Sequence, residues 1–372
     1  MTNGIYTEII SECERFARKE VRPRALEADL AGDREMAGLL WRKSGELDLP
    51  ILLVPESSGG AGMTPLTGGL VLDCLAAECA GLASLFVHHF AACVAVAAAG
   101  TAVAEQWLKA LTAADGDGFS LAAVCFPPEP GDETLTVSGE GDHLVINGRG
   151  PLFGNAGLAR TVVAFGVMQE THEPVAIRID PSAPGVGMES PLCLPGLKIN
   201  AFGRLTFGGV RLAGDDLLAS GPAAKKMERA GLDAFYGFVA AATMGCARSA
   251  LHKAREYAAQ RYQFKQMIIQ HQEIQRLLGN MRLQLDLGTA GYLDLLQGDQ
   301  WRPPFHCPDA SLVKAFSTDA AMDIVLDAIQ IHGGYGYMHE YGLEKQMRDI
   351  KVLQLLGGTN PCLLVRHLAD NL

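Results

Sequence analysis

The sequence has little positive charge and no cluster of it. Among its 372 residues, 31 Lys and Arg stand against 42 Asp and Glu, which gives a formal net charge of −11. The longest basic run is the pair Lys225-Lys226. Because binding to nucleic-acid phosphates requires clustered Lys and Arg, the composition argues against a nucleic-acid partner.

Several chemical motifs are also absent. The nine cysteines include no Cys-x-x-Cys pair, and an odd number of scattered cysteines is typical of reduced thiols in a cytoplasmic protein. No group of His, Cys and Asp has the spacing of metal ligands, so we expect no metal site. The sequence contains no Gly-x-Ser-x-Gly nucleophile motif. No strand is predicted before Gly334-Tyr-Gly336, so that segment is not a dinucleotide-binding fingerprint.

One long segment lacks charge altogether. Residues 79–104 carry no formal charge and are numerous enough to raise the question of a membrane span. The segment is mostly alanine, but it contains two glycines and the pair His88-His89, so we predict a buried core helix and no membrane span. Residues 1–15 carry acidic side chains and no apolar core, so we expect no signal peptide.

Hydrophobic spacing divides the chain into three regions. Helical periodicity dominates the first and last parts, and β-type runs dominate the centre. Residues 135–137 and 143–146 flank a Gly-Glu-Gly-Asp turn, which predicts a hairpin. The expected elements are helices near 5–16, 35–46 and 66–112, strands at 161–168, 175–179 and 204–210, and helices from 221 onward with breaks near 298–308 and 333–334. We therefore predict a mainly helical α+β fold with domains at 1–117, 118–220 and 221–372.

Segments spread over nearly the whole chain resemble those of one family in the same order. They are the Pro-Glu-x-x-Gly-Gly loop at 53–62, the strand at 207–212, the helical segments at 247–257 and 272–281 with Arg-Tyr-Gln-Phe at 261–264 between them, and the C-terminal runs at 310–320, 328–337 and 348–352. Together they resemble the acyl-CoA dehydrogenases. The resemblance implies an N-terminal helical domain, a central β domain and a C-terminal four-helix bundle that drives tetramer formation.

The resemblance also implies a cofactor and the residues that contact it. Family members bind FAD, and residues of the C-terminal bundle contact the FAD of a neighbouring subunit. The corresponding FAD contacts here are Arg261, Gln263, Phe264, Gln330, Gly333 and Gly334, with Thr359 at an adenosine-side position. A guanidinium offers a planar fork of donors to phosphates, and a Gly-Gly pair lets backbone approach a pyrophosphate. Taken alone, Arg261 is equally a surface cation and Gly333-Gly334 a helix C-cap.

Two departures from the family concern the catalytic base. The dehydrogenase reaction removes the α-proton of an acyl thioester while hydride leaves the β-carbon for flavin N5, and it needs a carboxylate near the α-carbon. Most members carry a Glu before a Gly-Thr near the C-terminus, where this sequence has Gly357. Other members carry the Glu in a Leu-Asp-x-Glu-Arg pattern, where this sequence has Phe235 and Tyr236. We therefore predict no catalytic residue at either family position.

The contacts to the flavin ring depart from the family as well. The family pattern Lys-x-Trp-Ile-Thr-Asn corresponds to residues 150–155, where Leu152 and Gly154 replace Trp and Thr and only Asn155 remains. The family's Thr-Glu-Pro-x-Ala-Gly-Ser-Asp segment corresponds to the dissimilar residues 125–132. The chain thus keeps the residues for a neighbour's FAD and lacks those for its own flavin ring and base.

Other side chains remain candidates for a base. Asp233 lies two residues before the lost helix position, which places it on roughly the opposite face, and it is equally a solvated acid near a helix N-terminus. His88 and His89 lie in a helix that lines the acyl pocket in relatives, and a histidine there titrates near neutral pH. The simpler interpretation is that one histidine is hydrogen-bonded in the core and the other lies at a helix interface, because buried polar side chains usually find partners. We expect His332 to be a positional residue.

These patterns leave three hypotheses about function. In the first, the chain is the non-catalytic partner in a heteromeric FAD-dependent acyl-CoA dehydrogenase and completes the FAD site of a sister subunit. In the second, it is a self-sufficient acyl-CoA dehydrogenase, or an enoyl-CoA reductase-like flavoenzyme, with an unconventional base or none. In the third, it is a non-enzymatic scaffold. The resemblance names acyl-CoA as ligand and electron-transferring flavoprotein as a possible acceptor.

Overall fold

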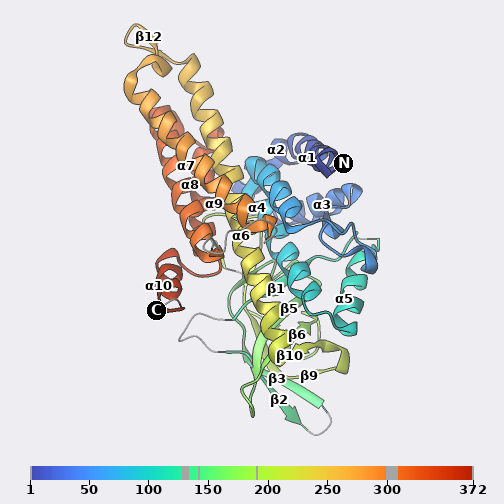
Figure 1. The fold of residues 1–372 in the computed structure, drawn as a ribbon. Coiled ribbons are helices and arrows are strands. Elements are labelled where there is room, and N and C mark those ends of the chain that lie inside the picture. The colour runs from blue at the N-terminus through green and yellow to red at the C-terminus, as the bar shows by residue number, and fades with distance from the viewer. Residues whose placement is uncertain are drawn as a thin grey trace.

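The chain folds into three regions that follow the sequence order (Figure 1). The computed structural model describes residues 2–116, 118–127, 134–140, 143–189, 192–298 and 309–370. Residues 141–142 of the predicted turn, residues 128–132 of the altered flavin segment and Cys307 lie outside these ranges. The helices are α1 Thr2–Phe16, α2 Arg22–Ala31, α3 Arg34–Ser44, α4 Pro65–Ala97, α5 Ala102–Thr112, α6 Gly221–Gln260, α7 Gln272–Gln297, α8 Ala310–His332, α9 Leu343–Leu355 and α10 Asn360–Asp370.

The N-terminal region is helical, as predicted, with α4 at its centre. α3 starts where the Asp33 side chain accepts a hydrogen bond from the Met36 backbone, and α5 starts where Thr101 caps the Ala104 backbone. α4 contains one non-helical residue, Cys79, with φ −157° and ψ 104°. Cys79 separates the first turns of α4, residues 65–78, from the uncharged part of the helix that begins at residue 79.

Two helices, α4 and α6, are long and apolar enough to cross a membrane by length and composition alone. In each, 83% of the apolar window is buried inside the protein. α4 packs along α6, and both belong to one hydrophobic core that extends through the helical regions. This burial is that of core helices, as the alanine-rich composition of residues 79–104 predicts.

The central region is an eight-stranded sheet with the order β10-β6-β5-β2-β3-β9-β7, to which β1 is added beside β5. Antiparallel pairing of Val137 with Ile146 confirms the predicted hairpin. Short strands β4 and β8 form a separate pair next to the helices. The strands are β1 Ala122–Cys125, β2 Thr136–Glu140, β3 His143–Arg149, β4 Phe153–Gly154, β5 Thr161–Met168, β6 Pro174–Ile179, β7 Val186–Met188, β8 Phe202–Gly203, β9 Leu205–Leu212 and β10 Leu217–Ser220.

The C-terminal region is a bundle of α6, α7, α8 and α9 that projects from the rest of the molecule (Figure 1). α8 starts at Asp309, whose side chain accepts from the Ser311 and Leu312 backbones, and ends at Gly333 with φ +59°. The predicted helical pattern after 221 has two additional breaks, at residues 261–271 and at residues 356–359 between α9 and α10. The hairpin of β11 (Tyr262–Gln263) and β12 (Gln266–Met267) joins α6 to α7 at the far end of the bundle.

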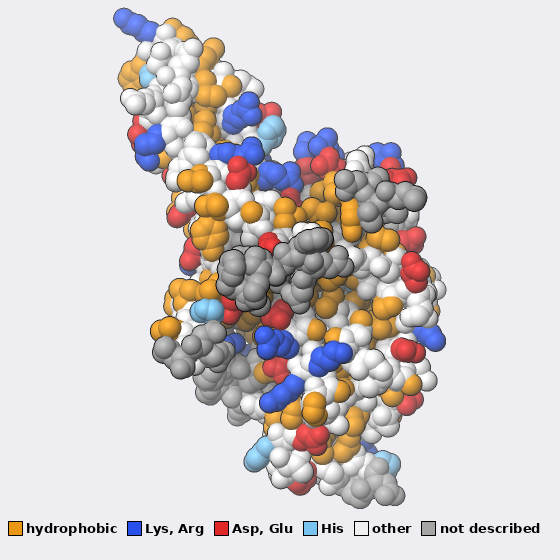
Figure 2. Space-filling model, viewed as in Figure 1, with side chains coloured by type: hydrophobic (Ala, Val, Ile, Leu, Met, Phe, Trp, Pro, Cys, Tyr) orange, Lys and Arg blue, Asp and Glu red, His pale blue; other side chains and the backbone are white. Residues whose placement is uncertain are grey.

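Hydrophobic side chains are exposed along this bundle (Figure 2). They belong to α7, α8 and the far end: Tyr262, Phe264, Met267, Leu283, Leu287, Phe316, Leu326, Tyr335, Tyr337 and Met338. Contiguous apolar patches of this kind mark protein–protein contact surfaces. The exposed apolar side chains make the bundle a candidate contact surface.

Candidate functional site

A cavity of about 490 Å³ opens where the β region meets the bundle. α4 contributes His88, and α6 contributes Phe235 and Tyr236. The last residue of α9, Leu355, and the segment from Leu356 to Thr359 complete this side. The sheet region supplies Leu152 and Phe153 among others. The cavity thus brings together positions 152, 235 and 357, which the sequence comparison treats as altered flavin and base positions.

The two positions that the resemblance implies for a catalytic base, 235 and 357, touch each other in this cavity. A Cβ atom on Gly357 would lie 2.7 Å from Tyr236 Cε1 and 2.9 Å from Phe235 Cε1, and Gly357 has φ +68°. The Tyr236 hydroxyl donates a hydrogen bond of 2.7 Å to the Gly357 carbonyl oxygen. The aromatic rings from α6 therefore fill the space that a side chain at 357 would need. Neither position offers a carboxylate.

Gly154, one of the positions that differ from the family pattern, also packs directly against an opposing side chain. A Cβ atom on Gly154 would lie 2.5 Å from His88 Nε2. Asn155 has φ +65° and donates from Nδ2 to the carbonyl oxygens of Leu85 at 2.9 Å and Ala122 at 3.1 Å. Asn155 therefore holds this turn in place, and the His88 imidazole occupies the space that a side chain at 154 would take.

The two adjacent histidines differ in their partners. His89 Nε2 lies 2.6 Å from the Pro50 carbonyl oxygen, and its Nδ1 accepts from the Ala122 backbone at 3.0 Å. This is the core histidine with two partners that the sequence reading allows. Neither nitrogen of His88 has a partner of normal hydrogen-bond geometry within the part of the chain that the structure describes. Burial lowers the pKa of each histidine to about 4.

These pKa values predict a loss of stability in mild acid. From the ordinary value of 6.5 down to about 4, the unfolded chain binds protons that the folded chain does not, so lowering the pH favours unfolding. At pH 5 each histidine reduces the free energy of unfolding by about 2 kcal/mol relative to pH 7. Urea denaturation at the two pH values measures this. His88→Leu should recover about half of the loss, and an unchanged loss in that variant would contradict the assignment.

An acid that the sequence reading overlooked lines the same cavity. Glu228 precedes Phe235 by two helical turns and lies on the same face of α6. Burial raises the pKa of its carboxyl, and Lys225 opposes that effect. The spacing of seven residues between Glu228 and Phe235 places both on one helix face, and this spacing could have identified Glu228 from the sequence. Asp233 is not among the residues that line the cavity. It lies more than three turns after the start of α6, so it is not an N-terminal acid of that helix. Its carboxylate lies 3.8 Å from the Arg229 guanidinium.

The predicted contacts to a neighbour's FAD gather at the far end of the bundle. Arg261 ends α6, Gln263 and Phe264 follow it in the hairpin, and the Arg261 guanidinium lies 6.0 Å from the Tyr335 ring centre. Phe264 is 84% exposed. The exposed residues Gln330, Gly333 and Gly334 lie at the end of α8, just before Tyr335. His332 bonds to the Ala328 carbonyl oxygen and stacks on Tyr257, which fits a positional role.

This end of the bundle fits the diphosphate part of a dinucleotide. An added Cβ atom on Gly333 or Gly334 would meet no atom within 4 Å, so the backbone there is open to a ligand. Within the described ranges, no ion pair is formed by Arg261. An accessible guanidinium beside open backbone is a suitable site for phosphate oxygens.

Thr359 lies apart from the other predicted contacts. It lines the central cavity just before α10, whereas the β11–β12 hairpin lies at the opposite end of the bundle (Figure 1). Within one chain the structure therefore does not bring Thr359 together with Arg261.

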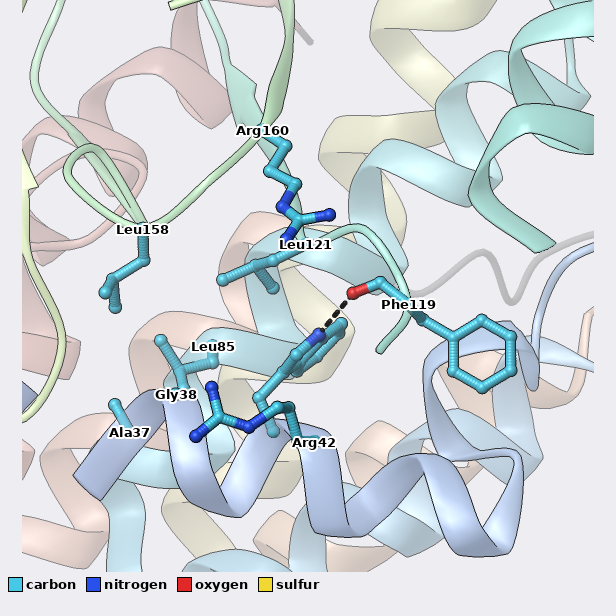
Figure 3. Close-up of a pocket in the computed structure, with 9 residues that line it drawn as sticks. Ala37, Gly38, Arg42, Leu85, Phe119, Leu121, Leu158 and Arg160 are labelled. Atoms are coloured by element: carbon cyan, nitrogen blue, oxygen red, sulfur yellow. Dashed lines mark hydrogen bonds between the residues drawn. The ribbon is translucent and has the colours of Figure 1, made fainter. Parts of the chain in front are cut away.

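A smaller cavity of about 240 Å³ lies between α3 and the loops beside β1 (Figure 3). The Trp41 indole forms part of its wall and donates a 2.8 Å hydrogen bond to the Phe119 carbonyl oxygen. Arg42 and Arg160 are the charged groups among its lining residues, which include no acid, histidine or cysteine. This cavity offers no group for acid–base chemistry.

Comparison with known proteins assigns the fold to a class of flavin-dependent oxidoreductases. Residues 6–115 match the family profile "Acyl-CoA dehydrogenase, N-terminal domain" and residues 230–371 match "Acyl-CoA dehydrogenase, C-terminal domain". The chain is 30% identical over 356 residues to the probable acyl-CoA dehydrogenase YngJ of Bacillus subtilis (strain 168), covering 93% of this chain and 92% of that protein. The chain belongs to the acyl-CoA dehydrogenase family, and the family assignment made from its motifs is confirmed.

More distant relatives agree with this assignment. The short-chain specific mitochondrial acyl-CoA dehydrogenase of Bos taurus is 27% identical over 354 residues, covering 94% of this chain and 85% of that protein. The structure of butyryl-CoA dehydrogenase from Megasphaera elsdenii has a TM-score of 0.86 at 26% identity, covering 97% of this chain and 96% of that chain. The predicted helical, β, helical layout is that of the family.

Proposed function

We propose that this chain is the non-catalytic partner in a heteromeric acyl-CoA dehydrogenase and completes the FAD site of a sister subunit. The observation that carries the proposal is the contrast between the two ends of the bundle in one chain. Residues suited to phosphate lie exposed at the far end of the bundle, away from the chain's own cavity. In that cavity both family base positions are occupied by groups that cannot take a proton.

In this family FAD accepts the hydride, and the residues of this chain would bind the FAD. We propose that Arg261 and the open backbone at Gly333 and Gly334 hold its diphosphate, with Gln263, Phe264 and Gln330 around it. Thr359, which the resemblance implies at an adenosine-side position, lines the chain's own cavity. There the residues do not fit the family's ring contacts, because Gly154 and Gly357 are covered by His88, Phe235 and Tyr236.

The proposal also covers the domain boundaries, the oligomer surface, the ligands and the cellular location. The domains are 1–117, 118–220 and 221–372, and the exposed apolar surface of the bundle is where a tetramer would form. Acyl-CoA is the proposed ligand of the assembly, and electron-transferring flavoprotein is the proposed acceptor. None of the eight described cysteines forms a disulfide, which supports a cytoplasmic location.

Replacing Arg261 by alanine should weaken FAD retention in the assembly. Loss of a charge-assisted contact to phosphate is expected to weaken binding about tenfold to a hundredfold. Flavin absorbance per protein after gel filtration measures the effect. Arg276→Ala is the matched control, because Arg276 pairs with Glu273 on the surface of α7. Equal flavin retention by the two variants would remove Arg261 from the proposed site.

A second candidate function is a self-sufficient flavoenzyme with an unconventional base. The observation that favours it is Glu228, a half-buried carboxyl with a raised pKa in the cavity wall. His89 is unsuited to this role because both of its nitrogens already have partners. If this candidate is correct, the purified chain carries one FAD per chain, and Glu228→Gln abolishes acyl-CoA oxidation while leaving the FAD bound.

A further inference from the structure

The smaller cavity, between α3 and the loops beside β1, is separate from the central cavity. Its volume is about 240 Å³, and the two cavities share no lining residue. Leu85, Leu121 and Leu158 give it apolar walls (Figure 3). An apolar cavity of about 150 Å³ is large enough to hold a benzene molecule. This cavity therefore has room for an apolar body of that size together with a polar group.

Arg42 of α3 brings an unpaired guanidinium to the cavity. Its Cγ lies 3.4 Å from the position that a Cβ on Gly118 would take, and its Nη1 lies 3.9 Å from the position of a Cβ on Gly38. The side chain thus runs under the loop at Gly118 and along one turn of its own helix. Within the described ranges, no hydrogen bond or ion pair involves Arg42. Its donors are available to a ligand in the cavity.

The cavity is positively charged, although the whole chain has a formal net charge of −11. Arg42 and Arg160 are the charged residues that line it, and no acidic residue lines it. Arg160 is partly balanced from outside the cavity, because its Nη1 bonds to the Asp115 carboxylate at 2.5 Å. Two guanidinium groups with one carboxylate between them leave a positive potential, which disfavours a cationic ligand and attracts an anion.

The combination of leucine walls and an unpaired guanidinium distinguishes three kinds of ligand. Inorganic phosphate pairs with Arg42 but leaves the leucine surfaces in contact with water. An uncharged hydrocarbon covers those surfaces but gives the guanidinium no acceptor. A carboxylic acid with an apolar body does both, because its two oxygens match the guanidinium fork and its body is removed from water against the leucines.

We infer that this cavity binds a small organic acid with an apolar body, such as hexanoate or phenylacetate, and that Arg42 pairs with the carboxylate of the acid. The site serves for binding alone, because no acid, histidine or cysteine lines it. The inference goes beyond the proposed subunit role, and it depends neither on FAD nor on acyl-CoA.

The test is calorimetric titration of the full chain, with its partner where one copurifies. The probes are hexanoate and phenylacetate, the amide of each acid, and inorganic phosphate. Each acid should bind about tenfold or more tightly than its uncharged amide and than phosphate, because a charge-assisted pair is stronger than a neutral one. Arg42→Gln should abolish the preference for acid over amide. Arg276→Gln, which removes a surface ion pair with Glu273, is the matched control and should leave the preference unchanged.

A second variant tests the location of the site and keeps Arg42. Gly38→Leu fills the cavity from α3, where an added Cβ has Arg42 Nη1, 3.9 Å away, as its neighbour. Replacing a glycine in a helix interior favours the helix, so this variant should stay folded and lose most of its affinity for both acids. Gly279→Leu, at an open position of α7, is the matched control and should bind as the wild type does. Circular dichroism checks that each variant is folded.

Four results would overturn the inference. They are equal binding of acid and amide, phosphate binding as tight as that of the acids, no saturable binding of either acid at millimolar concentrations, and unchanged binding in Arg42→Gln or Gly38→Leu. Flavin content, measured separately, tests the proposed subunit role, so the two can fail independently.

Discussion

Replacing Asp349 by alanine is expected to lower the free energy of unfolding by about 3–5 kcal/mol. Asp349 is fully buried in α9 and forms an ion pair with Lys345, which is 5% exposed. Its other oxygen accepts a 2.6 Å hydrogen bond from the Leu197 backbone. Although burial alone would lower the pKa of Lys345, Asp349 raises it above its ordinary value. Removing the carboxylate leaves a buried ammonium and a backbone N–H unpaired.

The contact matters because it ties the bundle to the β region. Leu197 lies in the loop before β8, and Lys345 also lies 3.8 Å from Cys79, at the break in α4. Chemical denaturation measures the change. The matched control is Glu189→Ala, which removes an ion pair with Arg149 that is exposed to solvent, and its unfolding curve should be almost unchanged. A small effect at Asp349 would show that the junction between the two regions contributes little stability.

Restoring the family carboxylate by Gly357→Glu is expected to yield no acyl-CoA oxidation and to destabilise the chain by about 2–4 kcal/mol. Gly357 has φ +68°, and its Cβ would overlap the Phe235 and Tyr236 rings. A glutamate there must either unfold this segment or displace the rings. Its carboxylate would also face a cavity that, in the proposed function, holds no flavin ring.

The appropriate control is a glycine with ordinary backbone geometry and free space. Gly279 in α7 meets no atom within 4 Å of an added Cβ, so Gly279→Ala should be neutral or slightly stabilising. Thermal unfolding and a dye-linked acyl-CoA oxidation assay measure the two expectations. A stable Gly357→Glu variant with substantial oxidation would contradict both the packing argument and the proposed absence of a flavin ring in this cavity.

The fold was predictable from local patterns for physical reasons. The 135–146 hairpin has a turn between two β-type runs, and its register follows from the turn. The end of α8 at Gly333 follows from a residue that adopts positive φ. The 261–271 break was missed because its polar residues also fit a helix surface. The short strands β4 and β8 were missed because two residues carry no periodicity.

The cavity was harder to predict, because it depends on complementarity between distant residues. His88 against Gly154, and Phe235 against Gly357, are pairs brought together only by folding. The sequence predicts that a carboxylate and a ring contact are missing, but it does not show that aromatic and imidazole side chains pack against Gly357 and Gly154. It also could not distinguish His88 from His89, because the hydrogen-bond partners of His89, Pro50 and Ala122, lie on other elements.

The measurement that tests the central claim most directly is the flavin content of this chain expressed alone, by absorbance and native mass. The proposed half-site predicts little or no FAD, and one FAD per two chains once the sister subunit is added. A homotetramer with one FAD per chain would contradict the partner-subunit role and direct attention to Glu228 and His88 as catalytic groups.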